Sequence, residues 1–194
     1  HNTALTFLDC SFNPLMSLDL THNSALIELG CRDTGLTELD ISRSTALTSL
    51  WCNANQLTTL DVSHNTALEI LDCYSNELTT LDVSANTALT ELDCDNNKLP
   101  SLGVSRNTSL TKLYCSSNLL TSLDVSANTA LTTLCCHSNQ LPSLDVSRNT
   151  ALTYLECEYN PGDGVSSFPI TAWFDNETVP AGLNVYSSSW QYDG

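Results

Sequence analysis

The chain repeats itself with a period of 21 residues, and this regularity restricts its fold more than any other feature. A unit with the consensus L-T-x-L-D-C-S-x-N-x-L-T-x-L-D-V-S-x-N-T-A recurs without insertion, beginning at Leu5, Leu26, Leu47, Leu68, Leu89, Leu110, Leu131 and Leu152. Units of this length bury their apolar faces only by stacking on one another. We therefore expect a solenoid of about eight coils over residues 1–160.

Each unit contains two similar halves. Residues 68–76 read L-E-I-L-D-C-Y-S-N, and residues 78–86 read L-T-T-L-D-V-S-A-N. In both halves an inward leucine, an outward residue and an inward Cys or Val alternate, which is typical of a half-buried strand. Neither half has the longer 3.6-residue periodicity of a helix. The fold class expected is therefore all-β, with two short parallel-stacked strands in every coil.

This pattern resembles the bacterial 21-residue class of leucine-rich repeats, sometimes called the IRREKO class. That class combines an L-x-x-L-x-C-x-x-N-x-L half with an L-x-x-L-D-V half, and the resemblance covers residues 5–160. It implies a recognition or adhesion module that is extracellular or on the bacterial cell surface, without naming a ligand. Residues 1–4 match the close of a repeat, so we also expect the chain to be part of a longer protein.

The period stops after Asn160 at the sequence Pro161-Gly162-Asp163-Gly164. Residues 161–194 read as short strands between Gly and Pro turns. Their six aromatic residues are Phe168, Trp173, Phe174, Tyr186, Trp190 and Tyr192. We expect this segment to form a β-rich cap whose rings pack over the open end of the core.

Two kinds of repeated residue have a structural explanation. One asparagine ends each half of most units, where an inward amide can satisfy both the donors and the acceptors that a bend exposes. Eight cysteines occupy the inward strand position, at Cys10, Cys31, Cys52, Cys73, Cys94, Cys115, Cys136 and Cys157. Parallel side chains one strand apart rarely reach the torsion of a disulfide, so we expect reduced core thiols. A metal ladder is the weaker alternative, because zinc-motif spacing is absent.

Charge and motifs exclude several functions. The chain has 22 acidic and six basic residues and a formal net charge of −16, which repels nucleic acid and anionic lipid surfaces. No apolar run is long enough to insert into a membrane as a helix. We find no phosphate loop, catalytic serine motif or zinc motif. The expectation is therefore no enzyme, no catalytic residue, no metal and no cofactor.

The outward positions of the two halves differ. Those of the second half repeat Thr, Ser and Asp, whereas those of the first half vary and include every aromatic residue of the repeats. Neutral drift would loosen both halves equally, so we interpret the first-strand face, expected to be concave, as a binding surface. The candidate ligand-binding residues are Phe7, Asp9, Trp51, Asp72, Tyr74, Asp93, Asp95, Tyr114, Tyr154, Glu156 and Glu158.

Rings interleaved with carboxylates suit a protein ligand with a basic surface. The same mixture suits a carbohydrate, with rings stacking on sugar faces and carboxylates accepting hydroxyl hydrogen bonds. A third alternative is an inert structural spacer of a larger surface protein. Residue types alone do not separate these three.

Two further groups allow alternative interpretations. An outward aspartate column in the second half is stabilised either by neighbouring serines and amides, which we favour, or by bridging calcium; it consists of Asp19, Asp40, Asp61, Asp82, Asp124 and Asp145. Cys135 breaks the cysteine pattern at an outward position, so we expect an exposed thiol there. With His137, Glu156 and Glu158 it is a candidate for adventitious metal, although ordinary surface residues are the favoured interpretation.

Overall fold

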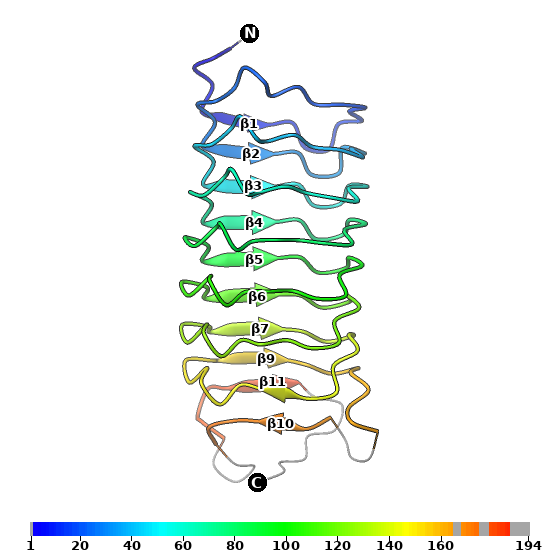
Figure 1. The fold of residues 1–194 in the computed structure, drawn as a ribbon, viewed down its shortest axis with the longest axis vertical. Helices are drawn as coiled ribbons and strands as arrows, with labels where there is room; N and C mark the ends of the chain where they lie inside the picture. Colours follow the sequence, from blue (N-terminus) through cyan, green and yellow to red (C-terminus); the bar gives the residue numbers. More distant parts are fainter. Residues whose placement is uncertain (1, 165–167, 175–178, 187–194) are drawn as a thin grey trace.

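In the computed structural model, which describes residues 2–164, 168–174 and 179–186, the chain winds into a parallel β-solenoid (Figure 1). The described residues contain no helix. One sheet contains nine strands: β1 (Phe7–Asp9), β2 (Glu28–Gly30), β3 (Ser49–Trp51), β4 (Ile70–Asp72), β5 (Glu91–Asp93), β6 (Lys112–Tyr114), β7 (Thr133–Cys135), β9 (Tyr154–Glu156) and β11 (Asn184–Tyr186). The predicted leucine-rich solenoid is confirmed.

The repeat period sets the register of the sheet. Leu50 pairs with Leu71 and Leu71 pairs with Leu92, so each residue lies beside its counterpart 21 residues along the chain. These central leucines are fully buried, and the residues on either side of them point to the opposite face. Every outward column of the sequence is therefore a physical column on the surface.

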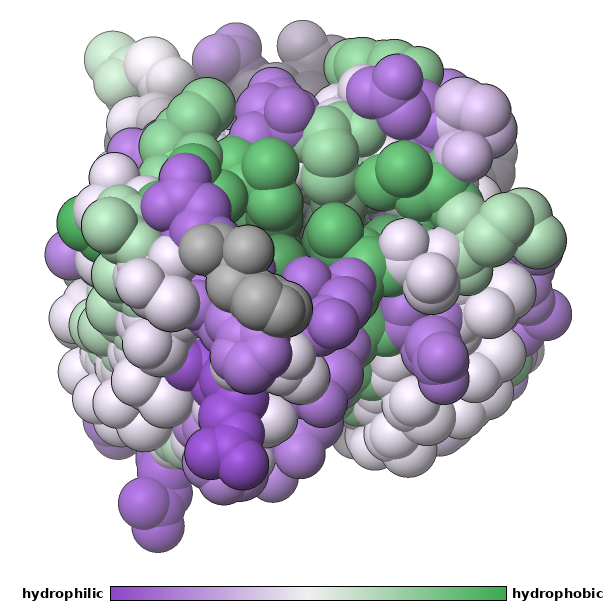
Figure 2. Space-filling view, turned by 90° about the horizontal axis from the view of Figure 1, so that it is seen from above, coloured by the Kyte–Doolittle hydropathy of each residue, from purple (hydrophilic) through white to green (hydrophobic). Residues whose placement is uncertain are grey.

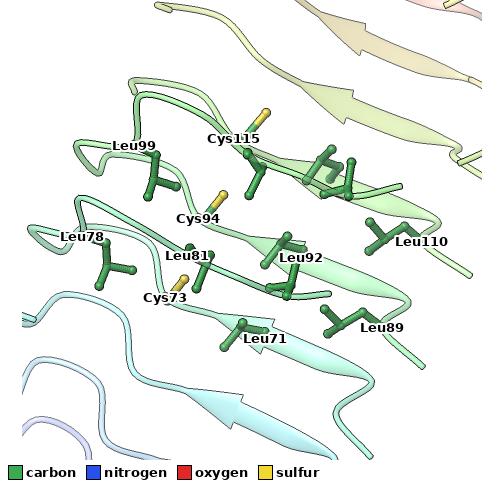
Figure 3. Packing of buried hydrophobic residues seen from close by; sticks show 14 of the residues in the cluster. Leu71, Cys73, Leu78, Leu81, Leu89, Leu92, Cys94, Leu99, Leu110 and Cys115 are labelled. Carbon is green, nitrogen blue, oxygen red and sulfur yellow. The ribbon is translucent and has the colours of Figure 1, made fainter. Parts of the chain in front are cut away.

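Leucines and cysteines fill the interior of the coils. Figure 3 shows Cys73, Cys94 and Cys115 stacked above one another among the leucines of three consecutive units. None of the nine cysteines forms a disulfide, and burial raises the pKa of the inward thiols Cys52, Cys73, Cys94, Cys115 and Cys136 well above its ordinary value. Viewed along the solenoid axis, apolar residues lie at the centre and polar residues surround them (Figure 2). The expectation of reduced core thiols is confirmed.

The second half of each unit differs from the expected strand. Among the described residues, only β8 (Leu144–Asp145) forms a strand there, and it pairs with β10 (Ile170–Thr171). In the other coils the backbone bonds between second halves are too few for a ladder: from Thr79 to Val83, only the Thr79 amide donates to the preceding coil, at 3.4 Å from the Thr58 carbonyl. Local turns are present in these coils and also beside β8, as from the Ser63 amide to Asp61 and from the Ser147 amide to Asp145, each at 2.9 Å. The expectation of two strands in every coil is therefore wrong.

The two asparagine columns bind differently. In the first column, Asn76 donates to the carbonyls of Cys52 and Cys73, both at 3.1 Å, and its amide oxygen accepts from Leu57 at 3.0 Å. In the second, Asn86 donates to the carbonyls of Val62 and Asn65 at 3.0 and 2.8 Å, but its amide oxygen has no partner. The expectation that each amide satisfies both kinds of group holds for the first column alone.

Each coil also bends through one residue with positive φ, just after the cysteine. These residues are Phe12, Asp33, Ala54, Ser75, Asn96, Ser117, Ser138 and Tyr159, with φ between 48° and 60°. Only Gly, Asn and Asp adopt this left-handed conformation readily. The stacked coils therefore impose it on unsuited residues such as Ala54, whose amide donates to the Tyr74 carbonyl at 2.9 Å.

The C-terminal segment continues the solenoid. Strand β11 adds to β9, with Tyr186 beside Glu156, and Phe168 and Phe174 are buried at the end of the core. Trp173 is half-buried and meets the Phe174 ring edge-on. Tyr186, expected to pack in the cap, is instead 49% exposed on the outer side of the sheet. Trp190 and Tyr192 lie outside the described residues.

Candidate functional site

The outward side chains of the nine-stranded sheet form one continuous surface, here called the sheet face. It includes the two outward residues of each strand and the residue two positions after each of β1–β7 and β9. All eleven candidate ligand-binding residues lie on it, because the stacking places each beside its counterpart on the next coil. Tyr186 is an addition that the repeat pattern did not predict.

Aromatic rings lie along this face at both ends. Phe7 is 57% exposed and Tyr74 is 38% exposed. Trp51 is half-buried, and the guanidinium carbon of Arg32 lies 4.9 Å from its ring centroid. Tyr154 is also half-buried, with its ring centroid 5.4 Å from that of Tyr186. The rings are thus partly embedded and keep a surface available for contact.

Three half-buried aspartates occupy the middle of the sheet face. Desolvation and repulsion from Asp93 raise the pKa of Asp72 to about 6 and that of Asp95 to about 7. Burial also raises the pKa of Asp93. The part of the chain that the structure describes gives none of the three an ion pair, since Lys112, the nearest lysine in the strand columns, binds Glu91 at 3.0 Å. At Asp72 the Tyr74 backbone amide and the Arg32 guanidinium offset only part of the rise. At Asp93 and Asp95 hydrogen bonds alone offset it.

Cys135 lies at the bottom of a hollow in the sheet face. The hollow has a volume of about 400 Å³ and is lined by Asp95, Tyr114, Thr133, Cys135, His137, Tyr154 and Glu156. Tyr114 and Glu156 flank Cys135 on the neighbouring strands. These larger side chains leave the thiol only 5% exposed, and burial with the nearby Glu156 carboxylate raises its pKa to about 12. The expected exposure of Cys135 is wrong, although its outward direction is right.

The geometry gives the metal alternative no support. His137 Nε2 lies 3.9 Å from Glu156 Oε1, which is an ion-pair distance if the imidazole is protonated. Among the described residues, no three His, Cys, Asp or Glu side chains are arranged to hold a metal ion. This applies equally to the aspartate column of the second half.

That aspartate column is stabilised locally. Backbone amides of the serines two residues on donate to it at 2.9 Å, as Ser63 does to Asp61 and Ser84 to Asp82. Hydrogen bonding by the serine side chain, and then by this backbone amide, lowers the pKa of both carboxyls. Two hollows of about 420 and 480 Å³ lie on this side, and their linings consist mostly of the repeated Thr, Ser, Asp and Leu residues. They are grooves between equivalent coils, without the varied chemistry of the sheet face.

The comparisons with solved structures decide the family. The functional domain of InlJ from Listeria monocytogenes, described as including a cysteine ladder, matches 96% of this chain with 37% sequence identity and a TM-score of 0.82. The chain is a bacterial leucine-rich-repeat protein. This leucine-rich-repeat protein spans 44% of the matched InlJ chain. A scan of family models and a search of curated proteins found no match.

Two more distant structures share the fold of this leucine-rich-repeat protein. Internalin C2 from Listeria monocytogenes has 20% identity and a TM-score of 0.72, over 87% of this chain and 74% of that one. A leucine-rich-repeat protein from Leptospira interrogans has 20% identity and a TM-score of 0.55, over 82% and 62% of the two chains. None of the described residues forms a helix able to cross a membrane.

Proposed function

We propose that this leucine-rich-repeat protein is a non-catalytic recognition or adhesion module that acts outside the cell or on the bacterial cell surface. It binds a protein ligand through the sheet face. The observation that carries the proposal is the contrast between the two halves of each coil: rings and half-buried carboxylates gather on the sheet face, whereas the other side mostly repeats Thr, Ser and Asp. The similarity to the InlJ functional domain and to an internalin supports a surface protein.

The charge on the sheet face favours a basic protein over a carbohydrate. Asp93 and Asp95 have lost hydration without gaining a cation, Arg32 offsets this only in part at Asp72, and sugar hydroxyls supply no opposite charge. Positive charge on a partner replaces the hydration that these carboxylates have lost. It also attracts the partner to the sheet face before contact. A carbohydrate ligand and an inert spacer remain the alternatives that the experiment below distinguishes.

The test compares binding by matched variants of the two sides. The domain is applied to arrayed surface proteins and to a glycan array, and the binding partner is then titrated against Trp51→Ala and Tyr74→Ala. Each should weaken binding by about 2 kcal/mol, because exposed Trp and Tyr are common hot spots. The controls, Thr58→Ala and Thr79→Ala, replace exposed residues of the second half. Equal effects from both sides, glycan binding alone, or no binding at all would contradict the proposal.

A further inference from the structure

The hollow above Cys135 exists because a small side chain interrupts a column of large ones. Along that column Tyr114, Cys135 and Glu156 are direct neighbours on β6, β7 and β9. Thr133 and His137 belong to the same coil as Cys135, and Tyr154 stands beside Thr133 on the next strand. The result is a depression of about 400 Å³ with a thiol floor and two tyrosine rings in its lining.

Two carboxyl groups belong to the lining of this hollow. Asp95 and Glu156 supply two carboxylates, and Tyr154 Oη donates to Glu156 Oε2 at 3.1 Å. His137, which lies 3.9 Å from Glu156, is the lining residue able to carry positive charge, and no Lys or Arg belongs to the lining. The hollow therefore combines aromatic walls with carboxylates that lack a strong cation.

Building on the proposed function, we propose that this hollow receives one arginine side chain of the partner protein. A guanidinium stacks on tyrosine rings and donates to carboxylates through several N–H groups in one plane. A guanidinium thus matches both the tyrosine rings and the carboxylates of the lining. It also places a positive charge beside Asp95 and Glu156. A lysine ammonium supplies the same charge but cannot stack as a plane, so it binds more weakly.

The test uses a small probe that needs no identified partner. Amide chemical shifts of the isotope-labelled protein are followed by NMR while the peptide acetyl-Gly-Arg-Gly-amide is added. The control peptide contains citrulline, which keeps the planar shape of arginine but has no charge. We expect a dissociation constant on the order of 1 mM for the arginine peptide and binding about tenfold weaker for citrulline. The shifts should centre on Cys135 and His137, and those near Asp82 should not change.

Three variants locate the binding. Asp95→Asn removes the charge but keeps the oxygen that accepts a hydrogen bond from the Ser116 backbone amide. Glu156→Gln likewise removes the charge of the second carboxylate and keeps a side-chain oxygen. Each should weaken arginine-peptide binding about tenfold. Cys135→Leu should fill the hollow and abolish the shifts. Asp82→Asn, on the other side of the solenoid, is the control and should bind as the parent does.

The pH response provides a second readout. Arginine stays charged throughout, so lowering the pH from about 8 to about 5 should weaken binding as Asp95, whose pKa is about 7, protonates. His137 and the neighbouring Asp93 also face this part of the sheet face. Glu156 and Cys135 also face the hollow, and the thiol stays protonated over this range because its pKa is about 12.

Equal affinity for the arginine and citrulline peptides would overturn the proposal, as would shifts outside the hollow or no shift at tens of millimolar peptide. If any of these results were obtained while binding of the partner still required Trp51 and Tyr74, the proposed function would stand without the arginine proposal. If Trp51→Ala and Tyr74→Ala both bound the partner as well as the parent does, the proposed function itself would be refuted.

Discussion

Removing one asparagine side chain leaves different backbone groups without a hydrogen-bond partner in the two asparagine columns. In Asn76→Ala, the carbonyls of Cys52 and Cys73 each retain a second asparagine donor, at 2.9 and 3.1 Å, but the Leu57 amide loses the oxygen it binds. Three lost hydrogen bonds cost about 1 kcal/mol each, and a buried amide without an acceptor costs about 1–3 kcal/mol more. We therefore expect this variant to lose about 4–6 kcal/mol of stability.

Asn86→Ala is the matched control, because Asn86 is also buried. The Val62 and Asn65 carbonyls keep backbone donors at 3.0 and 3.1 Å, and no amide donor depends on the Asn86 oxygen. The loss should be about 1–2 kcal/mol. Chemical unfolding followed by circular dichroism measures both variants against the parent. Equal losses, or a greater loss for Asn86→Ala, would refute the assignment of unequal roles to the two columns.

Three further predictions concern pH, the thiols and the backbone. The pKa of Asp95 is raised to about 7, so the folded state holds this proton more tightly than the unfolded chain, and the ionised group destabilises the fold increasingly as pH rises from about 4 to 7. Asp95→Asn should therefore melt at a higher temperature than the parent above neutral pH, with a smaller difference near pH ~4. Reductant should leave the melting temperature unchanged, and in folded protein half-exposed Cys10 should react with a thiol reagent before Cys135, as mass spectrometry will show. Ala54→Gly should stabilise the protein by about 0.5–1 kcal/mol in chemical unfolding, because glycine adopts positive φ without strain.

The repeat made most of the fold predictable. A strict 21-residue period allows only in-register stacking, so the inward leucines and thiols and the outward columns follow directly from residue numbers. The prediction of a strand in every second half was wrong, although the leucines there alternate as they do in a strand. Leucine alternation fixes which residues face inward, but not whether backbone groups of neighbouring coils come within hydrogen-bond distance, and over residues 79–83 only the Thr79 amide does so with the preceding coil.

The sequence was sufficient to predict which residues share the candidate surface, but not how deeply each of them is buried. Which residues share the sheet face follows from the period, and all eleven candidates lie there. The burial of Cys135 does not follow, because it depends on the sizes of Tyr114 and Glu156 on the neighbouring coils. The raised pKa of Asp95 likewise depends first on burial by the folded surroundings, then on Asp93 of the same coil, and to a smaller extent on Glu156, which is far away in sequence.

The constant register of the coils also bears on how such a molecule changes over generations. Each asparagine bond between coils joins residues 19, 21 or 24 positions apart, so the same partners recur in every unit. Deleting or duplicating one whole unit in the gene therefore leaves each remaining amide with an equivalent neighbour. Recombination between its own near-identical repeats can lengthen, shorten or shuffle the sheet face without disturbing the scaffold. New combinations of rings and charges can thus arise in a single genetic event.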